Sequence, residues 1–283
     1  MTEKISEITD HASSKDGIRL FYRHHPVENA RAGILIAHGL GEHSGRYARL
    51  TKDLTSAGFT VFAYDHRGHG QSQGKRGHIA CFQEYIDDLE IMIEKFRSAL
   101  SKDAPFFLLG HSMGGLIALN YAQQHGDTLS GVIASSPGLA PAEKPPAAKV
   151  AVARLMSVLM PAFSFDNELE VRFLSHDQKV VDAYLVDPLV HRRITARWGV
   201  EFMKTTEETM KNANRLQMPI LMQVAGDDRL ANPEASRTFF TDISSEDKTL
   251  RYYEEMYHEI YNETDNYRQQ VISDLEDWLN DHI

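Results

Sequence analysis

Short apolar runs of strand length alternate with helical patterns along most of this 283-residue chain. The runs are continuous rather than broken by a polar residue at every second position, which indicates strands covered on both faces and is typical of a parallel sheet. This order of elements predicts an α/β fold with a mostly parallel central sheet and flanking helices. The expected strands are 18–23, which enters from a hairpin, and 33–37, 60–64, 106–109, 131–134, 220–224 and 250–253. The expected helices are 46–57, 84–100, 116–125, 234–243 and 266–278.

The alternation breaks between about residues 138 and 214. That segment opens with several prolines and then shows helical patterns without a strand signal. An insertion at this point would lie above the carboxyl ends of the strands, where open sheets bind ligands. We therefore expect a core made of residues 1–137 and 215–283, and a helical cap, or lid, made of residues 138–214.

The first expected helix of the cap carries a wide apolar surface. Its members are Val150, Val152, Ala153, Leu155, Met156, Leu159 and Met160. Packing onto the main domain would account for most of these side chains. The alternative is an apolar lip that faces outward, guides an acyl chain and contacts lipid interfaces. In this alternative the substrate-binding residues of the lip are Met156, Leu159, Met160 and Phe163.

The hexapeptide from Gly110 to Gly115 lies between the expected strand 106–109 and the expected helix 116–125. Its sequence, Gly-His-Ser-Met-Gly-Gly, contains the pattern G-x-S-x-G, which is a weak signal by itself. Between a strand and a helix it describes a nucleophile elbow, a turn so tight that small residues must flank the serine. We expect Ser112 to be a nucleophile, and an ordinary turn with an incidental serine is the alternative.

A serine hydroxyl needs a base to take its proton, and a carboxylate to fix the tautomer of that base. In this kind of fold the acid and the histidine follow the serine in chain order, each after a strand. Asp227 and Asp228 follow the strand 220–224, and His258 follows the last expected strand. His258 is therefore the expected base. The spacing does not separate the two aspartates, and either could instead cap the following turn.

Acyl transfer also needs N–H donors that stabilise the negative oxygen of the tetrahedral intermediate. The backbone N–H of Met113 is one expected donor, because it lies at the positive end of the helix that follows Ser112. The other should come from the loop 38–43, whose two glycines let the backbone turn toward the site. Leu40 is the expected donor in that loop.

The segment 65–72 also follows a strand and contains two histidines. We interpret it as a glycine-punctuated turn in which Asp65 and Arg67 form structural pairs. His66 and His69 could suggest a metal site, but no third ligand has a recognisable spacing and no zinc signature occurs elsewhere. We therefore expect neither a metal nor an organic cofactor.

Composition limits the classes of partner. Lys and Arg total 30 against 40 Asp and Glu, and the net charge of −10 argues against nucleic-acid binding and against attraction to anionic membranes. The single cysteine, Cys81, cannot form an intramolecular disulfide, and the first residues lack the apolar core of a signal peptide. The apolar stretch 147–165 is too interrupted to span a bilayer. We expect a cytoplasmic protein without an integral membrane segment, whose membrane association is limited to peripheral contact through the cap.

These residues together resemble the monoacylglycerol lipase and lysophospholipase branch of the α/β-hydrolase family, over nearly the whole chain. The matching segments are 38–47, 65–72, 110–115, 187–189, 228–230 and 257–259. The resemblance implies a catalytic triad of Ser112, Asp228 and His258, which selects Asp228 over Asp227. It also implies that the cap contains an apolar tunnel for an acyl chain. Two cysteines that line the glycerol side in some vertebrate members have no counterpart here.

The resemblance implies hydrolysis of a carboxylic ester in a lipid-like substrate, foremost a monoacylglycerol, to fatty acid and glycerol through an acyl-enzyme on Ser112. A lysophospholipase or a general short- or medium-chain carboxylesterase is the alternative. An aminopeptidase would hold the substrate amine with acidic cap residues, but we interpret Glu168 and Glu170 as a solvated face. A catalytically inactive hydrolase fold used for binding is a further alternative. Such relatives usually lack one member of the triad, whereas all three positions are filled here.

Overall fold

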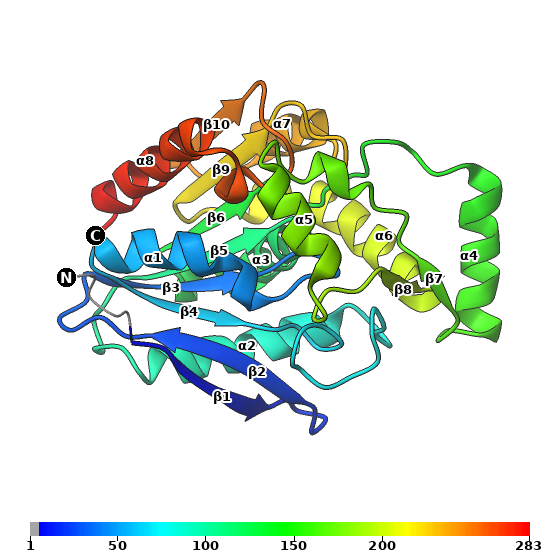
Figure 1. The fold of residues 1–283 in the computed structure, drawn as a ribbon, viewed down its shortest axis with the longest axis horizontal. Coiled ribbons are helices and arrows are strands. Elements are labelled where there is room, and N and C mark those ends of the chain that lie inside the picture. The colour runs from blue at the N-terminus through cyan, green and yellow to red at the C-terminus, as the bar shows by residue number, and fades with distance from the viewer. Residues whose placement is uncertain (1–5) are drawn as a thin grey trace.

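The computed structural model describes residues 6–283, in which eight strands form one sheet in the order β1-β2-β4-β3-β5-β6-β9-β10 (Figure 1). All neighbours from β4 to β10 are parallel, whereas β1 and β2 add an antiparallel hairpin at one edge. The strands are β1 (Ile8–Ser13), β2 (Arg19–His25), β3 (Ala32–Ala37), β4 (Phe59–Tyr64), β5 (Phe106–His111), β6 (Gly131–Ser135), β9 (Ile220–Ala225) and β10 (Lys248–Tyr253). The predicted α/β fold class is confirmed.

Helices cover both faces of this sheet, which explains why the central strands are apolar at consecutive positions. Every residue of β3, β4, β5, β6 and β9 is buried. One face packs against α1 and α8, and the other against α2, α3 and α7. These helices are α1 (Ala48–Ser56), α2 (Gln83–Arg97), α3 (Met113–His125), α7 (Pro233–Asp242) and α8 (Asp265–Asp281).

Two helix starts differ from the expectation by more than one residue. The expected helix 46–57 is a short 3-10 helix, η1 (Ser44–Tyr47), followed by α1. The helix α3 begins at Met113 and not at residue 116. The sequence pattern placed the start too late because two glycines, which have low helix propensity, lie inside the first turn. Ser112 therefore immediately precedes the N-terminus of a helix.

The segment between β6 and β9 stands outside the eight-stranded sheet, on the right of Figure 1. We call residues 138–214 the insertion. It contains α4 (Ala147–Leu159), β7 (Ser164–Asp166), η3 (Val171–Phe173), α5 (Gln178–Val186), β8 (Arg193–Thr195) and α6 (Ala196–Lys211), followed by η4 (Ala213–Arg215) at its end. The helix α6 packs on the core, where Trp198 Nε1 donates to the Tyr85 hydroxyl at 3.1 Å, and α4 packs on α6.

The expectation that the insertion contains no strand is wrong. The strands β7 and β8 form a two-stranded antiparallel sheet in which Phe165 opposes Ile194. Each has three residues, which is too few to leave an alternating pattern in the sequence. Within residues 6–283, no helix combines the length and the apolar composition that crossing a membrane requires.

Candidate active site

Ser112 occupies a strained turn between β5 and α3. Its backbone has φ of 52° and ψ of −116°, a left-handed conformation that costs energy for a residue with a side chain. The flanking glycines permit the close packing of this turn. A Cβ atom on Gly110 would lie 2.2 Å from the Gly114 carbonyl oxygen, and one on Gly114 would lie 2.1 Å from the Ala37 oxygen. The predicted elbow geometry is present, and Ser112 is only partly buried.

His258 follows β10 and is 4% exposed. Its Nδ1 lies 2.6 Å from Oδ2 of Asp228. The other carboxylate oxygen of Asp228 accepts from the backbone N–H groups of Leu230 at 2.8 Å and Ala231 at 2.9 Å, which fixes the carboxylate. Burial by itself lowers the pKa of His258, but the Asp228 carboxylate and its hydrogen bond, with Glu259, outweigh burial and raise that pKa.

Asp227 does not contact His258. Its carboxylate is partly exposed and forms an ion pair with Arg229 at 2.6 Å. The structure thus brings Asp228, and not its neighbour, to the imidazole, a distinction that the spacing of residues left open.

The residue that precedes Ser112 contacts His258, which places the serine and the imidazole in the same region. The ring of His111 lies 4.7 Å from the ring of His258. No hydrogen bond joins Ser112 Oγ to His258 in the part of the chain that the structure describes. Such bonds are often long in enzymes without substrate and tighten when substrate binds.

The loop between β3 and η1 lies against the elbow. A Cβ atom on Gly39 would lie 3.3 Å from the Cβ of Ser112. Glu42 Oε1 accepts from the Gly39 N–H at 2.6 Å, and His191 of the insertion donates its N–H to the Gly41 oxygen at 2.8 Å. These contacts hold the loop that contains Leu40 against the turn at Ser112, where α3 begins.

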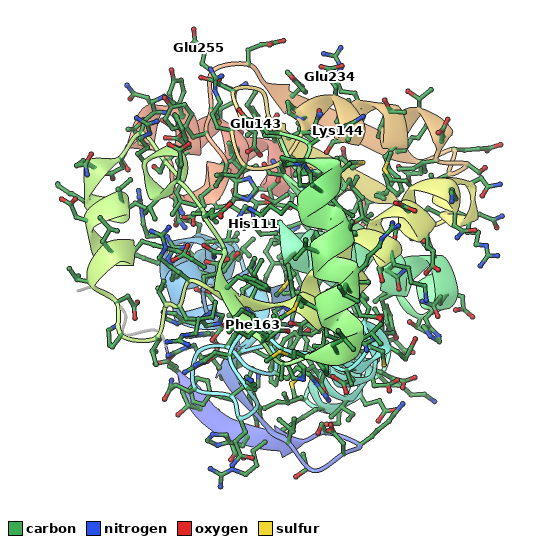
Figure 2. All side chains as sticks on the ribbon, turned by 90° about the vertical axis from the view of Figure 1, so that its right-hand side faces the viewer. His111, Glu143, Lys144, Phe163, Glu234 and Glu255 are labelled. Carbon is green, nitrogen blue, oxygen red and sulfur yellow. The ribbon has the colours of Figure 1, made fainter. Side chains whose placement is uncertain are left out.

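The four predicted substrate-binding residues of the insertion differ in their exposure to solvent. Leu159, Met160 and Phe163 are 67%, 52% and 44% exposed, whereas Met156 is half-buried. Seen from the side of the insertion, α4 stands in front, and Phe163 is labelled beside the lower part of this helix (Figure 2). The exposed surface continues over Val152, Leu155 and Val158 of the same helix.

The segment 65–72 forms the structural turn that its sequence predicts. The carboxylate of Asp65 accepts from the backbone N–H groups of Ser44 and Gln71, and Arg67 forms a two-point pair with Asp88 at 2.6 and 2.7 Å. His66 and His69 are buried next to His38. Among the described residues, no group of three or more His, Cys, Asp or Glu side chains is arranged to hold a metal ion.

A buried set of ion pairs, which the sequence motifs do not predict, links the loop that contains Leu40 to the segment that carries His258. Arg46 Nη1 lies 2.7 Å from Oε2 of Glu42, and the Arg46 guanidinium forms a two-point pair with Glu259 at 2.5 and 2.8 Å. Burial by itself lowers the pKa of Arg46, but Glu259 and Glu42 raise it above its ordinary value. Glu42, Arg46 and Glu259 lie in the segments 38–47 and 257–259, which carry part of the family resemblance. Their presence in these segments was the only sequence signal for the ion pairs.

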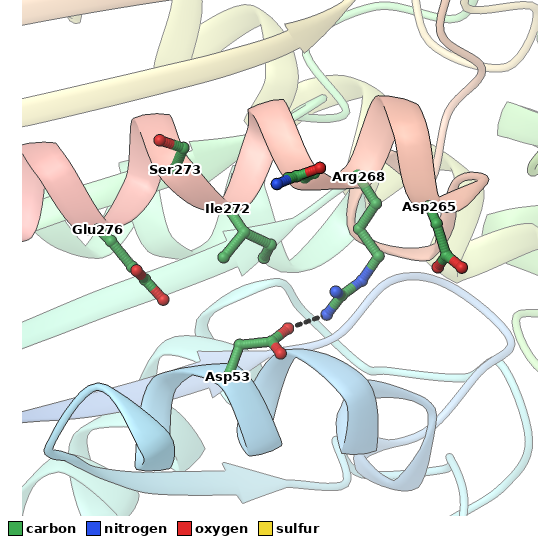
Figure 3. A pocket seen from close by; sticks show the side chains of 7 residues that line it. Asp53, Asp265, Arg268, Ile272, Ser273 and Glu276 are labelled. Atoms are coloured by element: carbon green, nitrogen blue, oxygen red, sulfur yellow. Dashed lines mark hydrogen bonds and ion pairs between the residues drawn. The ribbon is translucent and has the colours of Figure 1, made fainter.

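A polar hollow of about 450 Å³ between α1 and α8 lies outside this site (Figure 3). It is lined by Asp53, Asp265, Arg268, Gln269, Ile272, Ser273 and Glu276. Arg268 forms an ion pair with Asp53 across it. None of the predicted triad residues lines this hollow, so we do not associate it with the chemistry at Ser112.

A family model described as Hydrolase_4, serine aminopeptidase S33, matches residues 28–265. The chain belongs to this family. This hydrolase is 37% identical over 234 residues to phospholipase YtpA of Bacillus subtilis. That alignment covers 82% of this chain and 89% of the relative. It is 33% identical over 276 residues to the monoglyceride lipase of Rattus norvegicus, and this alignment covers 96% of this chain and 90% of the rat protein.

The solved structures contain the same fold. A soluble variant of monoglyceride lipase from Saccharomyces cerevisiae, in complex with a substrate analog, superposes with a TM-score of 0.89 at 28% identity. The alignment covers 100% of this hydrolase and 97% of the yeast chain. The resemblance to the α/β-hydrolase family that the motifs indicated is therefore confirmed, and the protein is a carboxylic ester hydrolase.

Proposed function

We propose that this serine hydrolase cleaves monoacylglycerols to fatty acid and glycerol through an acyl-enzyme on Ser112. The observation that carries the proposal is the buried hydrogen bond of 2.6 Å between His258 and Asp228, beside the strained turn at Ser112. The names of the relatives support a lipid ester as substrate, since they include monoglyceride lipases and a phospholipase.

In this mechanism the Ser112 hydroxyl attacks the ester carbonyl while Nε2 of His258 takes its proton. Asp228 holds the Nδ1 proton of the imidazole, which fixes the tautomer and stabilises the imidazolium. The N–H groups of Leu40 and Met113 donate to the oxyanion. His258 then gives its proton to the glycerol oxygen, which leaves. Water, activated by the same imidazole, hydrolyses the acyl-enzyme and releases the fatty acid.

The substrate class is tested by comparing rates on monooleoylglycerol, lysophosphatidylcholine and p-nitrophenyl esters of graded chain length. The proposal requires the highest kcat/KM on the monoacylglycerol. A preference for lysophosphatidylcholine would make the enzyme a lysophospholipase, and a preference for acetate or butyrate esters would make it a general carboxylesterase.

An aminopeptidase activity, which the family description names, has weak support from the insertion. Glu168 and Glu170 are exposed and are paired with Lys149 at 2.5 Å and Arg172 at 2.7 Å. Carboxylates that are solvated and already paired are poor ligands for a substrate amine, because they offer it little gain over water. This supports an ester substrate over a peptide.

The activity is expected to depend on pH through His258. Only the neutral imidazole can take the Ser112 proton, so kcat/KM falls as pH drops through the pKa of His258. Because that pKa is raised, the acid limb is expected to have its midpoint above about pH 6.5, the ordinary value for histidine. Rates on p-nitrophenyl butyrate across the pH range measure it. A midpoint in the ordinary range of carboxylic acids would exclude His258 as the titrating base.

We further propose that the insertion acts as a cap, and that its exposed apolar side chains contact lipid interfaces. Burying a leucine side chain contributes about 1.5–3 kcal/mol, and each 1.4 kcal/mol changes an affinity about tenfold. The variant Leu159→Ser is therefore expected to lower the rate on vesicle-bound monooleoylglycerol by about tenfold, with an unchanged rate on dissolved p-nitrophenyl butyrate. Ile8→Ser is the control, since Ile8 is exposed but lies on β1. Equal rates of the Leu159 variant and the parent on vesicles would contradict the proposal.

A further inference from the structure

The carboxylate of Glu263 is fully buried five residues after His258 and has no lysine or arginine partner among the described residues. Its charge is compensated by hydrogen-bond donors. Oε1 accepts from the Tyr257 N–H at 2.9 Å and lies 2.7 Å from Nδ1 of His176. Oε2 accepts from the backbone N–H groups of His176 at 3.0 Å and Thr264 at 3.2 Å. A buried carboxylate with this many donors is a rigid junction, because losing it leaves several donors unsatisfied.

The donors come from two parts of the chain that are remote in sequence. Tyr257 immediately precedes His258, whereas His176 belongs to the insertion. The His176 ring also stacks on the Tyr257 ring, with centroids 3.7 Å apart and planes 19° apart. Glu263 and His176 therefore both hold Tyr257, one through its backbone N–H and the other through its ring, and they bond to each other.

The backbone around His258 is fastened to the same part of the insertion. The N–H groups of His258 and Glu259 donate to the Phe173 and Leu174 carbonyl oxygens at 3.4 and 2.8 Å. The Ser175 hydroxyl donates to the Asn262 oxygen at 2.9 Å. Consecutive residues of the insertion thus contact the segment that carries His258 along most of its length.

We propose that Glu263 and His176 are positioning residues that fix the imidazole of His258 relative to Ser112. Asp228 determines the tautomer of that imidazole, whereas Glu263 determines where its backbone lies. Through His176, the insertion supplies part of this support, so the insertion contributes to the chemical step as well as to substrate access. The inference rests on the proposed role of His258 as the base.

The test compares Glu263→Gln with Glu254→Gln, which changes an exposed glutamate in the same connection between β10 and α8. In the Glu263→Gln variant an amide NH2 group faces backbone N–H donors, and the resulting shift of His258 is expected to lower kcat by about 10- to 100-fold, because a displacement of about 1 Å can cost that much. KM is expected to stay within about twofold, because substrate contacts are unchanged. The low-field NMR signal of the His258 Nδ1 proton, which reports the bond to Asp228, is expected to shift or broaden.

A second pair of variants keeps the test informative if Glu263→Gln fails to fold. His176 is partly exposed, and an asparagine side chain can present an N–H at the position of Nδ1. We expect His176→Leu to lower kcat by about tenfold and His176→Asn to restore most of it, at similar melting temperatures. Full kcat in His176→Leu, or equal losses in both His176 variants, would overturn the inference.

Labelling of Ser112 by a fluorophosphonate separates failure of this inference from failure of the proposed function. Absence of labelling in the parent enzyme would contradict the proposed function itself. Labelling of the parent with equally fast labelling of Glu263→Gln would leave the function in place and overturn only the positioning role.

Discussion

Replacing Ser112 with alanine is expected to abolish ester hydrolysis, with kcat reduced by about 10⁶-fold, the scale observed when a triad serine is removed. No other described serine combines partial exposure, the left-handed turn between a strand and a helix, and proximity to His258. The measurement is the release of oleate from monooleoylglycerol by purified protein. The exposed Ser101→Ala variant is the control and should retain the parent rate.

The fold of the Ser112 variants can be checked independently of activity. Alanine does not relieve the positive φ at this position, whereas glycine adopts it readily. Ser112→Gly is therefore expected to be as inactive as the alanine variant but more stable than it, by about 1 kcal/mol or more in the free energy of unfolding. An active Ser112→Ala protein with an unchanged melting temperature would place the nucleophile elsewhere.

Asp228→Asn is expected to lower kcat by about 10⁴-fold, the size of effect seen when the orienting aspartate of such a triad is made an amide. The amide can present an N–H to Nδ1 of His258 and so stabilise the tautomer whose Nε2 carries a proton and cannot accept one. Asp227→Asn is the matched control, because it loses only a partly exposed ion pair with Arg229, which is worth little. Rates on the same ester under identical conditions measure both variants.

Equal losses in the two aspartate variants would contradict this assignment. Loss in Asp227→Asn alone would mean that the chain rearranges around β9 in solution, so that the neighbouring carboxylate reaches the imidazole. The pH profile adds a second criterion, because the raised pKa of His258 depends partly on Asp228. The acid limb of any residual activity in Asp228→Asn is therefore expected to move to lower pH.

The central strands and the order of the reactive residues could be predicted because they depend on local patterns. The sheet is parallel and covered on both faces, so strands such as β5 and β9 are continuous apolar runs. Ser112 and the aspartate pair closely follow such runs, His258 comes after the more polar strand β10, and the carboxyl ends of parallel strands meet at one edge. Choosing Asp228 over Asp227 required either the family resemblance or the geometry, because adjacent residues share the same spacing.

The supporting contacts could not be predicted in this way. Glu259 and Glu263 are glutamates in a polar segment and would ordinarily be expected on the surface. Their burial depends on Arg46 and His176, and Arg46 lies 213 residues from Glu259 in the sequence. The short strands β7 and β8 were missed for a related reason, since three-residue strands are stabilised by their pairing and not by a pattern of their own.

The insertion leaves the sheet after β6 and returns at β9, and these two strands are neighbours in the sheet. Both of its ends are therefore anchored side by side, and the segment can change length or sequence without altering the order or register of any strand. With the proposed role of the insertion as a cap, selectivity for a substrate and the ability to break its ester bond would be encoded in largely separate stretches of the gene. The residues from Phe173 to His176 are where the two requirements coincide, so an exchange of insertions between relatives would have to preserve this short stretch even when everything around it is replaced.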